Sequence, residues 1–262
     1  MKKIFRDKTN NDYWEERWAK SGVDKDEFED ENIYPIKYAN LAIKKGDKIL
    51  EAGCGAGRVY FHYKKRGFNI KGIDFSKSGI KNILDKDKSA DVEVANISQV
   101  QYPNENFDLI LAFGLYHKIE DTNELKKSFK ETVRILKKKG QLVASVRFDS
   151  LENNIIENIV KKRSDKNFNK FHRWHFSLND MKNLLGTEIE IKKVYYARNV
   201  SFLFKFDYFR TKILKSSNFS ESIARSTGFK LNWIGTILDN FLHFFFPRFF
   251  SNLLVILAEK KQ

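Results

Sequence analysis

The sequence predicts an α/β fold built on a mostly parallel, doubly wound sheet, and three observations lead to this prediction. Apolar, β-branched runs of strand length recur along the chain, at residues 48–52, 69–74, 91–96, 107–113, 141–148 and 188–196. Segments with helical periodicity separate most of these runs, which is the alternation expected of a parallel sheet. The first run leads directly into the alternating glycines Gly53, Gly55 and Gly57, as in sheets that bind nucleotides.

Residues 1–45 are expected to form a helical cap before the sheet. Residues 13–18 have a helical pattern, and a second helix begins near Pro35 and ends before Gly46. Between them lies an acidic stretch that predicts a loop, with Asp24, Asp26, Glu27, Glu29, Asp30 and Glu31. The aromatic residues Tyr13, Trp14 and Trp18 are candidates for a lid over a bound ligand, although aromatic residues at helical spacing pack in cores as often.

The glycine turn follows an apolar strand that ends near an acid, Glu51. Glycines permit positive φ and remove the β-carbons that would keep a ligand away from the main chain. After a predicted helix at residues 59–66, the second strand ends in Asp74, whose carboxylate could accept both hydroxyls of a ribose. A dinucleotide fingerprint would require glycine at position 58, where this chain has Arg58.

In this pattern and in four later ones, the chain resembles the class I S-adenosylmethionine-dependent methyltransferases. Within them it is similar to the small-molecule group of ubiquinone and menaquinone methyltransferases, the type 11 group. The resemblance covers residues 47–149. The later matches keep the family's order along the chain, at residues 94–97, 102–110, 113–121 and 133–142. Two departures stand out, because Asn96 replaces the usual aspartate and Lys138-Lys139 replace a Pro-Gly pair. Neither removes the cofactor chemistry.

The resemblance implies a Rossmann-like, seven-stranded sheet whose last strand is antiparallel, with an N-terminal helical lid and a helical insertion before the last strand. It implies S-adenosyl-L-methionine as cofactor and S-adenosyl-L-homocysteine as product. In the family, the residue matching Asp74 holds the ribose, that matching Phe75 lies against the adenine, and that matching Asn96 reads the adenine edge. The expected cofactor-binding residues are Tyr13, Trp14, Glu51, Gly53, Gly55, Arg58, Asp74, Phe75, Asn96, Ile97 and Phe113.

Methyl transfer requires the acceptor atom to lie on the axis of the S–CH3 bond, and orientation alone can contribute roughly 7 to 11 kcal/mol. A general base is needed only when the acceptor is a hydroxyl or a protonated amine. His117 is the candidate base because it follows the fourth strand, and Tyr116 shares its site. A second group, His172, Arg173, Trp174 and His175, follows the fifth strand and is expected to wall the acceptor pocket. No metal is predicted, since no pair of these residues has the spacing of metal ligands with carboxylates to complete the site.

The C-terminal part is rich in phenylalanine. Ser177 and Asp180 predict a capping box that starts a helix through Leu185. Twelve of the 24 phenylalanines lie after residue 200. We predict a helical insertion over the acceptor site at residues 201–250 and a last strand within 251–262, after a cap at 1–45 and the sheet domain at 46–200. The insertion either buries its aromatic residues or offers them to a greasy acceptor or a membrane, aided by Lys205, Arg210, Lys212, Lys215 and Arg225.

Composition narrows the class of protein and its location. The chain has 262 residues, 42% of them hydrophobic, which suits a substantial core. Cys54 is the only cysteine, which excludes an internal disulfide and a multi-cysteine zinc site. No signal-peptide pattern or spanning segment is evident, so we expect a cytoplasmic protein, with peripheral membrane contact through 201–250 as one option. The net charge of +14 permits nucleic acid, an anionic membrane or a phosphorylated small substrate as partner, or a lysine-rich solvated surface.

Several alternatives remain beside a methyltransferase acting on a small-molecule or a lipid- or carrier-linked acceptor, whether hydrophobic or anionic. In residues 161–174, lysine and arginine alternate with aromatic residues, a pattern suited to binding RNA phosphates and stacking on RNA bases. An RNA methyltransferase is therefore one alternative. Nucleic-acid amino methylation is disfavoured because Pro35, Pro103 and Pro247 are the only prolines and form no Pro-Pro motif. An NAD-dependent oxidoreductase and a non-catalytic adenosine-ligand-binding protein are the alternatives from other classes.

Overall fold

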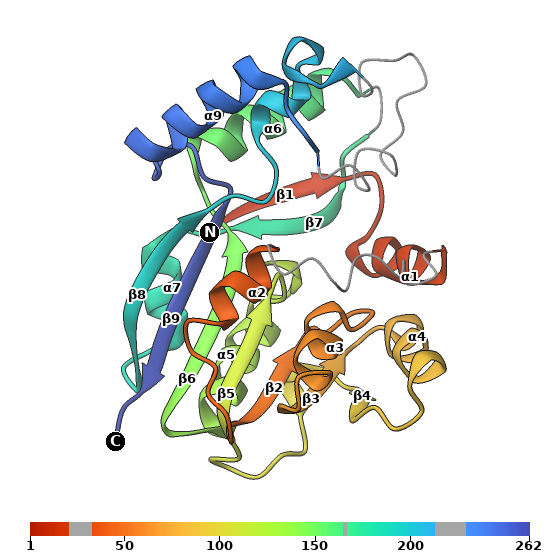
Figure 1. Cartoon of the computed structure of the whole chain (residues 1–262), viewed down its shortest axis with the longest axis vertical. Coiled ribbons are helices and arrows are strands. Elements are labelled where there is room, and N and C mark those ends of the chain that lie inside the picture. Colours follow the sequence, from red (N-terminus) through yellow and green to blue (C-terminus); the bar gives the residue numbers. More distant parts are fainter. Residues whose placement is uncertain (21–32, 165–166, 213–228) are drawn as a thin grey trace. The chain divides into compact units, whose positions relative to one another are not determined.

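The computed structural model describes residues 1–20, 33–164, 167–212 and 229–262 (Figure 1). Its main sheet has seven strands in the order β4-β3-β2-β5-β6-β9-β8. The parallel strands are β2 (Lys48–Ala52), β3 (Asn69–Asp74), β4 (Val92–Val94), β5 (Phe107–Phe113) and β6 (Leu136–Arg147). The predicted acidic loop at 24–31 lies outside the described residues, as do Phe219, Lys215 and Arg225.

The last two strands, β8 (Ile189–Ala197) and β9 (Leu253–Lys260), run antiparallel to each other. The main-chain N–H of Lys261 donates to the carbonyl of Glu188 over 2.9 Å, and the N–H of Asn252 donates to the carbonyl of Ala197 over 3.1 Å. Each pair joins the start of one strand to the end of the other. The predicted Rossmann-like fold with an antiparallel last strand is therefore confirmed.

Side-chain caps fix where the helices begin. The helix α4 (Lys77–Lys86) is capped by Ser76, and α5 (Thr122–Ile135) is capped by the Asp121 carboxylate. The helix α7 (Leu178–Leu185) begins with the predicted capping box of Ser177 and Asp180. The helix α2 (Tyr34–Ala39) has a proline in its first turn, and α3 (Arg58–Lys64) follows the glycine turn.

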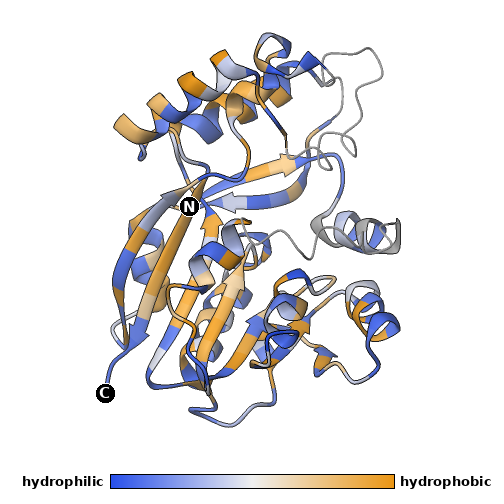
Figure 2. Cartoon of the chain, viewed as in Figure 1, coloured by the Kyte–Doolittle hydropathy of each residue, from blue (hydrophilic) through white to orange (hydrophobic). Residues whose placement is uncertain are grey.

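The hydrophobic core lies on both sides of the central strands. Strands β2, β5 and β9 are hydrophobic along most of their length (Figure 2), as expected for strands covered on both faces. The ring of Phe129 in α5 stacks on Tyr116 with centroids 4.0 Å apart. Both side chains are fully buried, so aromatic packing holds α5 against the segment that follows β5.

A second, two-stranded sheet was not predicted. Strand β1 (Lys2–Arg6) pairs antiparallel with β7 (Lys170–His175), so residues 2–6 are extended while α1 (Asn10–Lys20) and α2 supply the predicted helical cap. The side chain of Ile4 is buried and its neighbours are exposed, which is the two-residue period of a strand. Strand β6 also begins earlier than predicted, because Leu136 pairs with Phe107.

The chain forms two compact units, one made of residues 1–147, 167–195 and 254–262, the other of 148–166 and 196–253. The second unit contains α6 (Leu151–Lys162), the short helices η4 (Phe202–Lys205) and η5 (Asp207–Phe209), and α9 (Trp233–Phe245). These elements include the helices that the sequence predicted before the last strand. The four-segment division expected from the sequence stays a prediction.

A buried carboxyl group lies inside the second unit. The main-chain N–H of Phe202 donates to Oε1 of Glu152 over 2.9 Å, and the N–H of Glu152 donates to the carbonyl of Phe249 over 2.9 Å. The Glu152 side chain is fully buried. Burial raises the pKa of Glu152 from 4.5 to about 7, although the positive charge of Arg198 opposes this rise. Glu152 is therefore a group whose ionisation weakens this unit.

We expect the stability of the protein to fall as the pH rises from about 4.5 to about 7. A folded-state pKa about 2.5 units above the unfolded value lowers the free energy of unfolding by about 3 kcal/mol once both states are ionised. Glu152→Gln keeps the oxygen that accepts from Phe202 and does not ionise, so this part of the pH dependence should vanish. Urea unfolding followed from pH 4.5 to 8 tests it, with the exposed Glu190→Gln as control. An identical pH dependence in wild type and Glu152→Gln would contradict the assignment.

Candidate cofactor and acceptor site

The turn between β2 and α3 depends on its three glycines. Gly53, Gly55 and Gly57 have φ values of 81°, 54° and 86°, a region that other residues rarely adopt. A β-carbon on Gly57 would lie 2.8 Å from Cγ1 of Ile83, so the turn also needs the missing side chain. The N–H groups of Gly53 and Cys54 both donate to the carbonyl of Ile73, at 2.8 and 3.0 Å. The glycine turn is therefore fastened to the end of β3.

Asp74 completes this fastening. Its Oδ2 accepts a hydrogen bond from the N–H of Gly55 and its Oδ1 accepts one from the N–H of Ser76, both over 2.8 Å. The side chain is only 7% exposed, and burial raises its pKa while the two main-chain N–H groups oppose that rise. Each carboxylate oxygen has a second lone pair, so the same group can still accept from a ribose hydroxyl.

Glu51 lies in β2 directly before the turn. Its side chain is 5% exposed, and within the described part of the chain its Oε2 is buried without a hydrogen-bond partner. Burial, and next the charge of Asp74, raise the pKa of Glu51 well above its usual value. A buried carboxyl oxygen of this kind fits a cationic ligand group such as the ammonium of the methionine part of S-adenosylmethionine, because a partner there would favour the ionised form.

Helix α1 lies over the glycine turn. A β-carbon on Gly55 would lie 2.8 Å from the Trp18 ring, so that ring rests directly against the turn. The Trp14 and Trp18 rings stack with centroids 5.4 Å apart, and Tyr13 meets Trp14 edge to face. Nδ2 of Asn82 in α4 donates to the carbonyl of Trp18 over 2.8 Å. Of the predicted lid residues, Trp18 is thus in contact with the predicted cofactor turn, and Trp14 and Tyr13 pack behind it.

The other predicted cofactor residues surround the carboxyl ends of the strands. Phe75 is exposed after β3, and Arg58 is the first residue of α3. Oδ1 of Asn96 accepts from the N–H of Ser98 over 3.1 Å and caps the short helix η2 (Ile97–Gln99), where Ile97 is buried. Phe113 ends β5 and meets Tyr34 edge to face at 6.0 Å. Their roles toward the cofactor stay predictions.

The two predicted catalytic residues lie in the short helix η3 (Tyr116–Lys118) and differ in their surroundings. The Tyr116 hydroxyl lies 2.8 Å from Oγ1 of Thr132, which itself donates to the carbonyl of Ser128. Tyr116 is therefore the donor, and its side chain is fully enclosed in the core. It has the position of a packing residue, so we do not carry it into the proposed reaction.

His117 is 4% exposed, and its Nδ1 is buried with no hydrogen-bond partner among the residues that the structure describes. Burial lowers its pKa well below the usual value, with further lowering by the positive charges of Lys118, Arg147 and Arg173. His117 is therefore neutral at neutral pH. It can accept a proton, but only as a weak base.

The residues predicted to wall the acceptor pocket, His172 to His175, lie in strand β7. Nε1 of Trp174 donates to the carbonyl of Ile119 over 2.9 Å, which ties β7 to the segment after η3. His172 meets Tyr13 of the lid edge to face at 6.2 Å. Sequence reasoning missed Leu115, whose Cδ1 would lie 3.3 Å from a β-carbon on Gly53, and it missed Arg147 at the end of β6. Leu115 lies within the match at residues 113–121 and Arg147 within the strand predicted at residues 141–148, but neither pattern singled the residue out.

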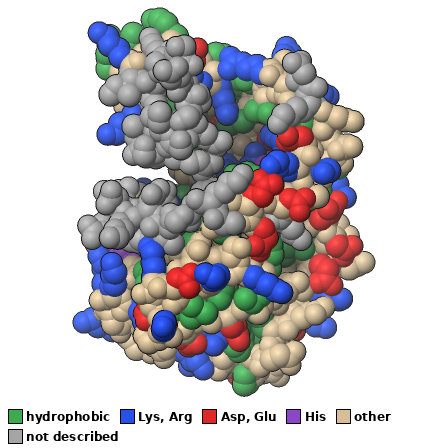
Figure 3. Space-filling model, turned by 90° about the vertical axis from the view of Figure 1, so that its right-hand side faces the viewer, with side chains coloured by type: hydrophobic (Ala, Val, Ile, Leu, Met, Phe, Trp, Pro, Cys, Tyr) green, Lys and Arg blue, Asp and Glu red, His purple; other side chains and the backbone are tan. Residues whose placement is uncertain are grey.

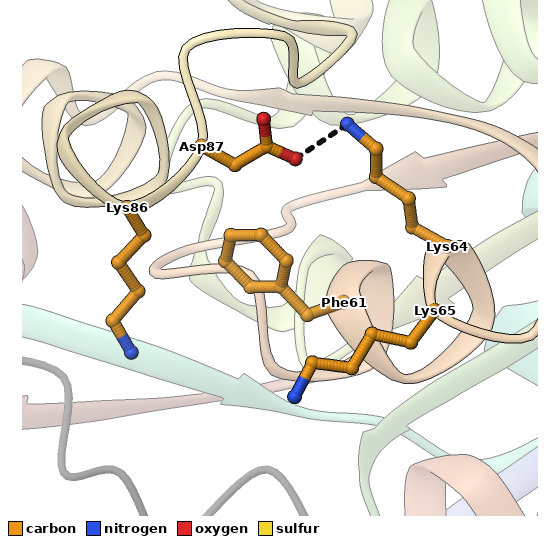
Figure 4. Close-up of a pocket in the computed structure, with 5 residues that line it drawn as sticks. All are labelled: Phe61, Lys64, Lys65, Lys86 and Asp87. Atoms are coloured by element: carbon orange, nitrogen blue, oxygen red, sulfur yellow. Dashed lines mark hydrogen bonds and ion pairs between the residues drawn. The ribbon is translucent and has the colours of Figure 1, made fainter.

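A surface pocket of about 490 Å³ lies at the ends of α3 and α4 (Figure 4). Phe61, Lys64, Lys65, Lys86 and Asp87 line it, and Lys64 pairs with Asp87 over 2.7 Å. It contains none of the predicted site residues. In the described ranges, no group of three or more His, Cys, Asp or Glu side chains is arranged to hold a metal ion. The helices of the same ranges are too short or too polar to cross a bilayer.

Comparisons with known proteins concern the domain and the fold. Residues 50–144 match the family model described as "Methyltransferase domain". The chain is 24% identical over 149 residues to the methyltransferase GfsG of Streptomyces halstedii, covering 54% of this chain and 51% of GfsG. It is 28% identical over 240 residues to an uncharacterised protein of Methanocaldococcus jannaschii, covering 88% and 86%. A solved SAM-dependent methyltransferase of Methanosarcina mazei superposes with a TM-score of 0.58 at 18% identity, covering 87% of this chain and 98% of that one.

The fold is thus that of a Rossmann-like methyltransferase, which matches what the glycine turn and the strand order indicate. Residues 50–144 therefore carry a methyltransferase domain of the S-adenosylmethionine-dependent class. The family and the fold imply S-adenosyl-L-methionine as the cofactor. The chain spans about half the length of GfsG.

We expect Glu51→Gln to weaken S-adenosylmethionine binding by about 10- to 100-fold, because the loss of a charge-assisted hydrogen bond costs roughly 1.5 to 3 kcal/mol. The pKa of Glu51 is raised in the folded protein, so its ionisation lowers stability as the pH rises. The ligand-free variant should therefore be at least as stable as wild type at pH 8. Calorimetry and urea unfolding measure the two effects, and unchanged affinity would remove Glu51 from the site.

Proposed function

We propose that this protein transfers a methyl group from S-adenosylmethionine to a small-molecule or a lipid- or carrier-linked acceptor. The observation that carries the proposal is the cradle around the glycine turn. Asp74 fastens the turn while keeping lone pairs for a ribose, and the buried Oε2 of Glu51 is available to a cation beside it. The bound cofactor supplies an already activated methyl group, so the protein has to bind, orient and exclude water.

His117 is the proposed acceptor-side residue. Since burial and neighbouring positive charges keep it neutral, it can take a proton from an acceptor whose proton is acidic, and it is too weak a base for an ordinary alcohol. This favours an acceptor that is already ionised or becomes so easily. Tyr116 is left out of the reaction because its hydroxyl is bonded to Thr132 in the core.

The relatives do not identify the acceptor of this protein, because they include methyltransferases of small molecules, tRNA and protein. On the part of the face in Figure 3 that is not grey, the Lys and Arg side chains occur at separate places among other residues, so this part gives no particular support to an RNA acceptor. A continuous basic groove is the usual footprint of a single-strand binder.

Calorimetry with S-adenosylmethionine, S-adenosylhomocysteine and NAD tests the proposal. We expect binding of the first two, and Asp74→Ala should reduce it at least 100-fold because both the turn and the ribose lose a partner. Asp74→Asn keeps one oxygen and should retain part of the affinity. The exposed Asp91→Ala serves as control, with circular dichroism to confirm folding. Preference for NAD, or normal binding by a folded Asp74→Ala, would defeat the proposal.

A second part of the proposal concerns the surface of α9. Trp233 and Phe244 are 73% and 78% exposed, and Ile237, Phe241 and Phe245 share their side of the helix at positions spaced by three or four residues. Lys230 and Arg248 flank this helix. An amphipathic helix with aromatic residues and basic neighbours is suited to lie in the interface of an anionic membrane. We propose that α9 docks this protein on such a surface.

Vesicle flotation tests the docking. We expect the protein to float with vesicles of phosphatidylcholine and phosphatidylglycerol, and to do so less with phosphatidylcholine alone. Ile237→Ser with Phe244→Ser should reduce the bound fraction at least fivefold, since two large apolar side chains lose their contact with lipid. Asn240→Ser on the same helix is the control. Binding that is absent, or that the double variant leaves unchanged, would refute the membrane role of α9.

A further inference from the structure

Basic side chains from four elements come together around His117 and His172. Arg6 ends β1, Lys118 ends η3, Arg147 ends β6 and Arg173 lies in β7. The pairing of β1 with β7 sets Arg173 opposite Ile4. The N–H of Phe176 donates to the carbonyl of Arg147 over 2.8 Å, which brings the end of β6 to the end of β7. Nζ of Lys118 lies 3.5 Å from the carbonyl of His172, so η3 contacts the same strand.

The positive charges of this cluster lower the pKa of two histidines, His117 and His172. Burial lowers the pKa of His117, and Lys118, Arg147, Arg173 and His175 lower it further. Burial lowers the pKa of His172 as well, followed by the charges of Lys118, Arg173, Arg6 and Arg147. Lys118, Arg147 and Arg173 therefore act on both imidazoles, and Arg6 acts on that of His172. The named charges that act on both imidazoles are positive, and the histidines themselves stay neutral.

The cluster adjoins the cofactor turn. Leu115, two residues before His117, lies against Gly53. Nζ of Lys118 lies 5.5 Å from the centre of the Trp14 ring, which stacks on Trp18, and Trp18 rests against Gly55. A ligand held by the cluster would thus have one end near the basic side chains and another near the turn. That is the placement a methyl acceptor requires.

The chemistry of these groups selects the kind of ligand. Guanidinium groups offer paired N–H donors that match the oxygens of a carboxylate or a phosphate, and lysine adds a point charge. His117 adds a buried, unpartnered Nδ1 at the same place, among the residues that the structure describes. A neutral acceptor would gain nothing from this arrangement, whereas an anion would be both attracted and oriented by it.

We propose that Arg6, Lys118, Arg147 and Arg173 bind a carboxylate or phosphate group of the methyl acceptor. The inference rests on the proposed methyl transfer, and it narrows the acceptor to an anionic molecule. The anionic group is fixed at the β1-β7 side, and the acceptor atom then lies between it and the glycine turn. These four are binding and positioning residues, while His117 is the group next to the reacting atom.

Inorganic phosphate and acetate are suitable probes, titrated by calorimetry into the protein with and without S-adenosylhomocysteine. We expect saturable binding of at least one anion, weakened tenfold or more by Lys118→Gln and by Arg173→Gln. Lys65→Gln is the matched control, because Lys65 lines the surface pocket of Figure 4 and would respond if any lysine-lined surface bound the anion. Its affinity should stay within twofold of wild type. Nitrogen-15 spectra of the imidazoles should also show the pKa of His117 and His172 rising when the anion binds.

Absence of saturable binding would overturn the inference, as would weakening of equal size in Lys118→Gln and Lys65→Gln. Circular dichroism of each variant separates loss of binding from loss of fold. The nitrogen-15 spectra of His117 and His172 test anion binding in the wild-type protein, so this measurement does not depend on any variant folding. Failure of the anion site with intact S-adenosylhomocysteine binding leaves the methyltransferase proposal standing. Failure of cofactor binding with an intact anion site removes that proposal instead.

Discussion

The contact on which the rest of the site depends is the one between the Asp74 carboxylate and the main chain of the glycine turn. Three residues with positive φ make the turn sharp, and without an anchor such a turn would have many conformations. The carboxylate joins it to the end of β3 by accepting from Gly55 and Ser76. The position of Glu51, the start of α3 and the surface on which Trp18 rests all follow from that join.

Burial without full compensation is a recurring property of this protein. Glu51, His117 and Glu152 are each nearly or fully enclosed, and burial shifts each toward its neutral form. Glu51 lies next to the glycine turn, where a cation is proposed to bind, and His117 lies in the helix η3 that contacts β7, where an anion is proposed to bind. Electrostatic interactions with a bound ligand are stronger in the low dielectric around these buried groups. The same burial lowers the stability of the ligand-free protein.

The sequence was sufficient for the strands that position the cofactor turn. Strands β2, β3 and β5 have the predicted bounds, because each is rich in apolar residues and is bounded by turn-forming or polar residues. Strand β1 was missed because its partner, β7, lies more than 160 residues later, and only one of its side chains is buried. The start of β6 was missed because Lys137 to Lys139 have the polarity of a turn, while pairing with β5 decides their conformation. The inward direction of Tyr116 and the meeting of Arg6 with Arg147 depend on packing between distant segments, which no local pattern encodes.

The placement of β9 also bears on how the protein folds during synthesis. This strand is made of residues 253–260 and lies between β6 and β8 in the sheet, so β8 has no neighbour to join until β9 has been made. The ribosome releases that segment after the other six strands of the sheet, and its pairing closes loops of high contact order. The nascent chain can assemble the cofactor half of the sheet early, but the apolar edge of β6 stays open to chaperones and to other chains until residues 253–260 have been made.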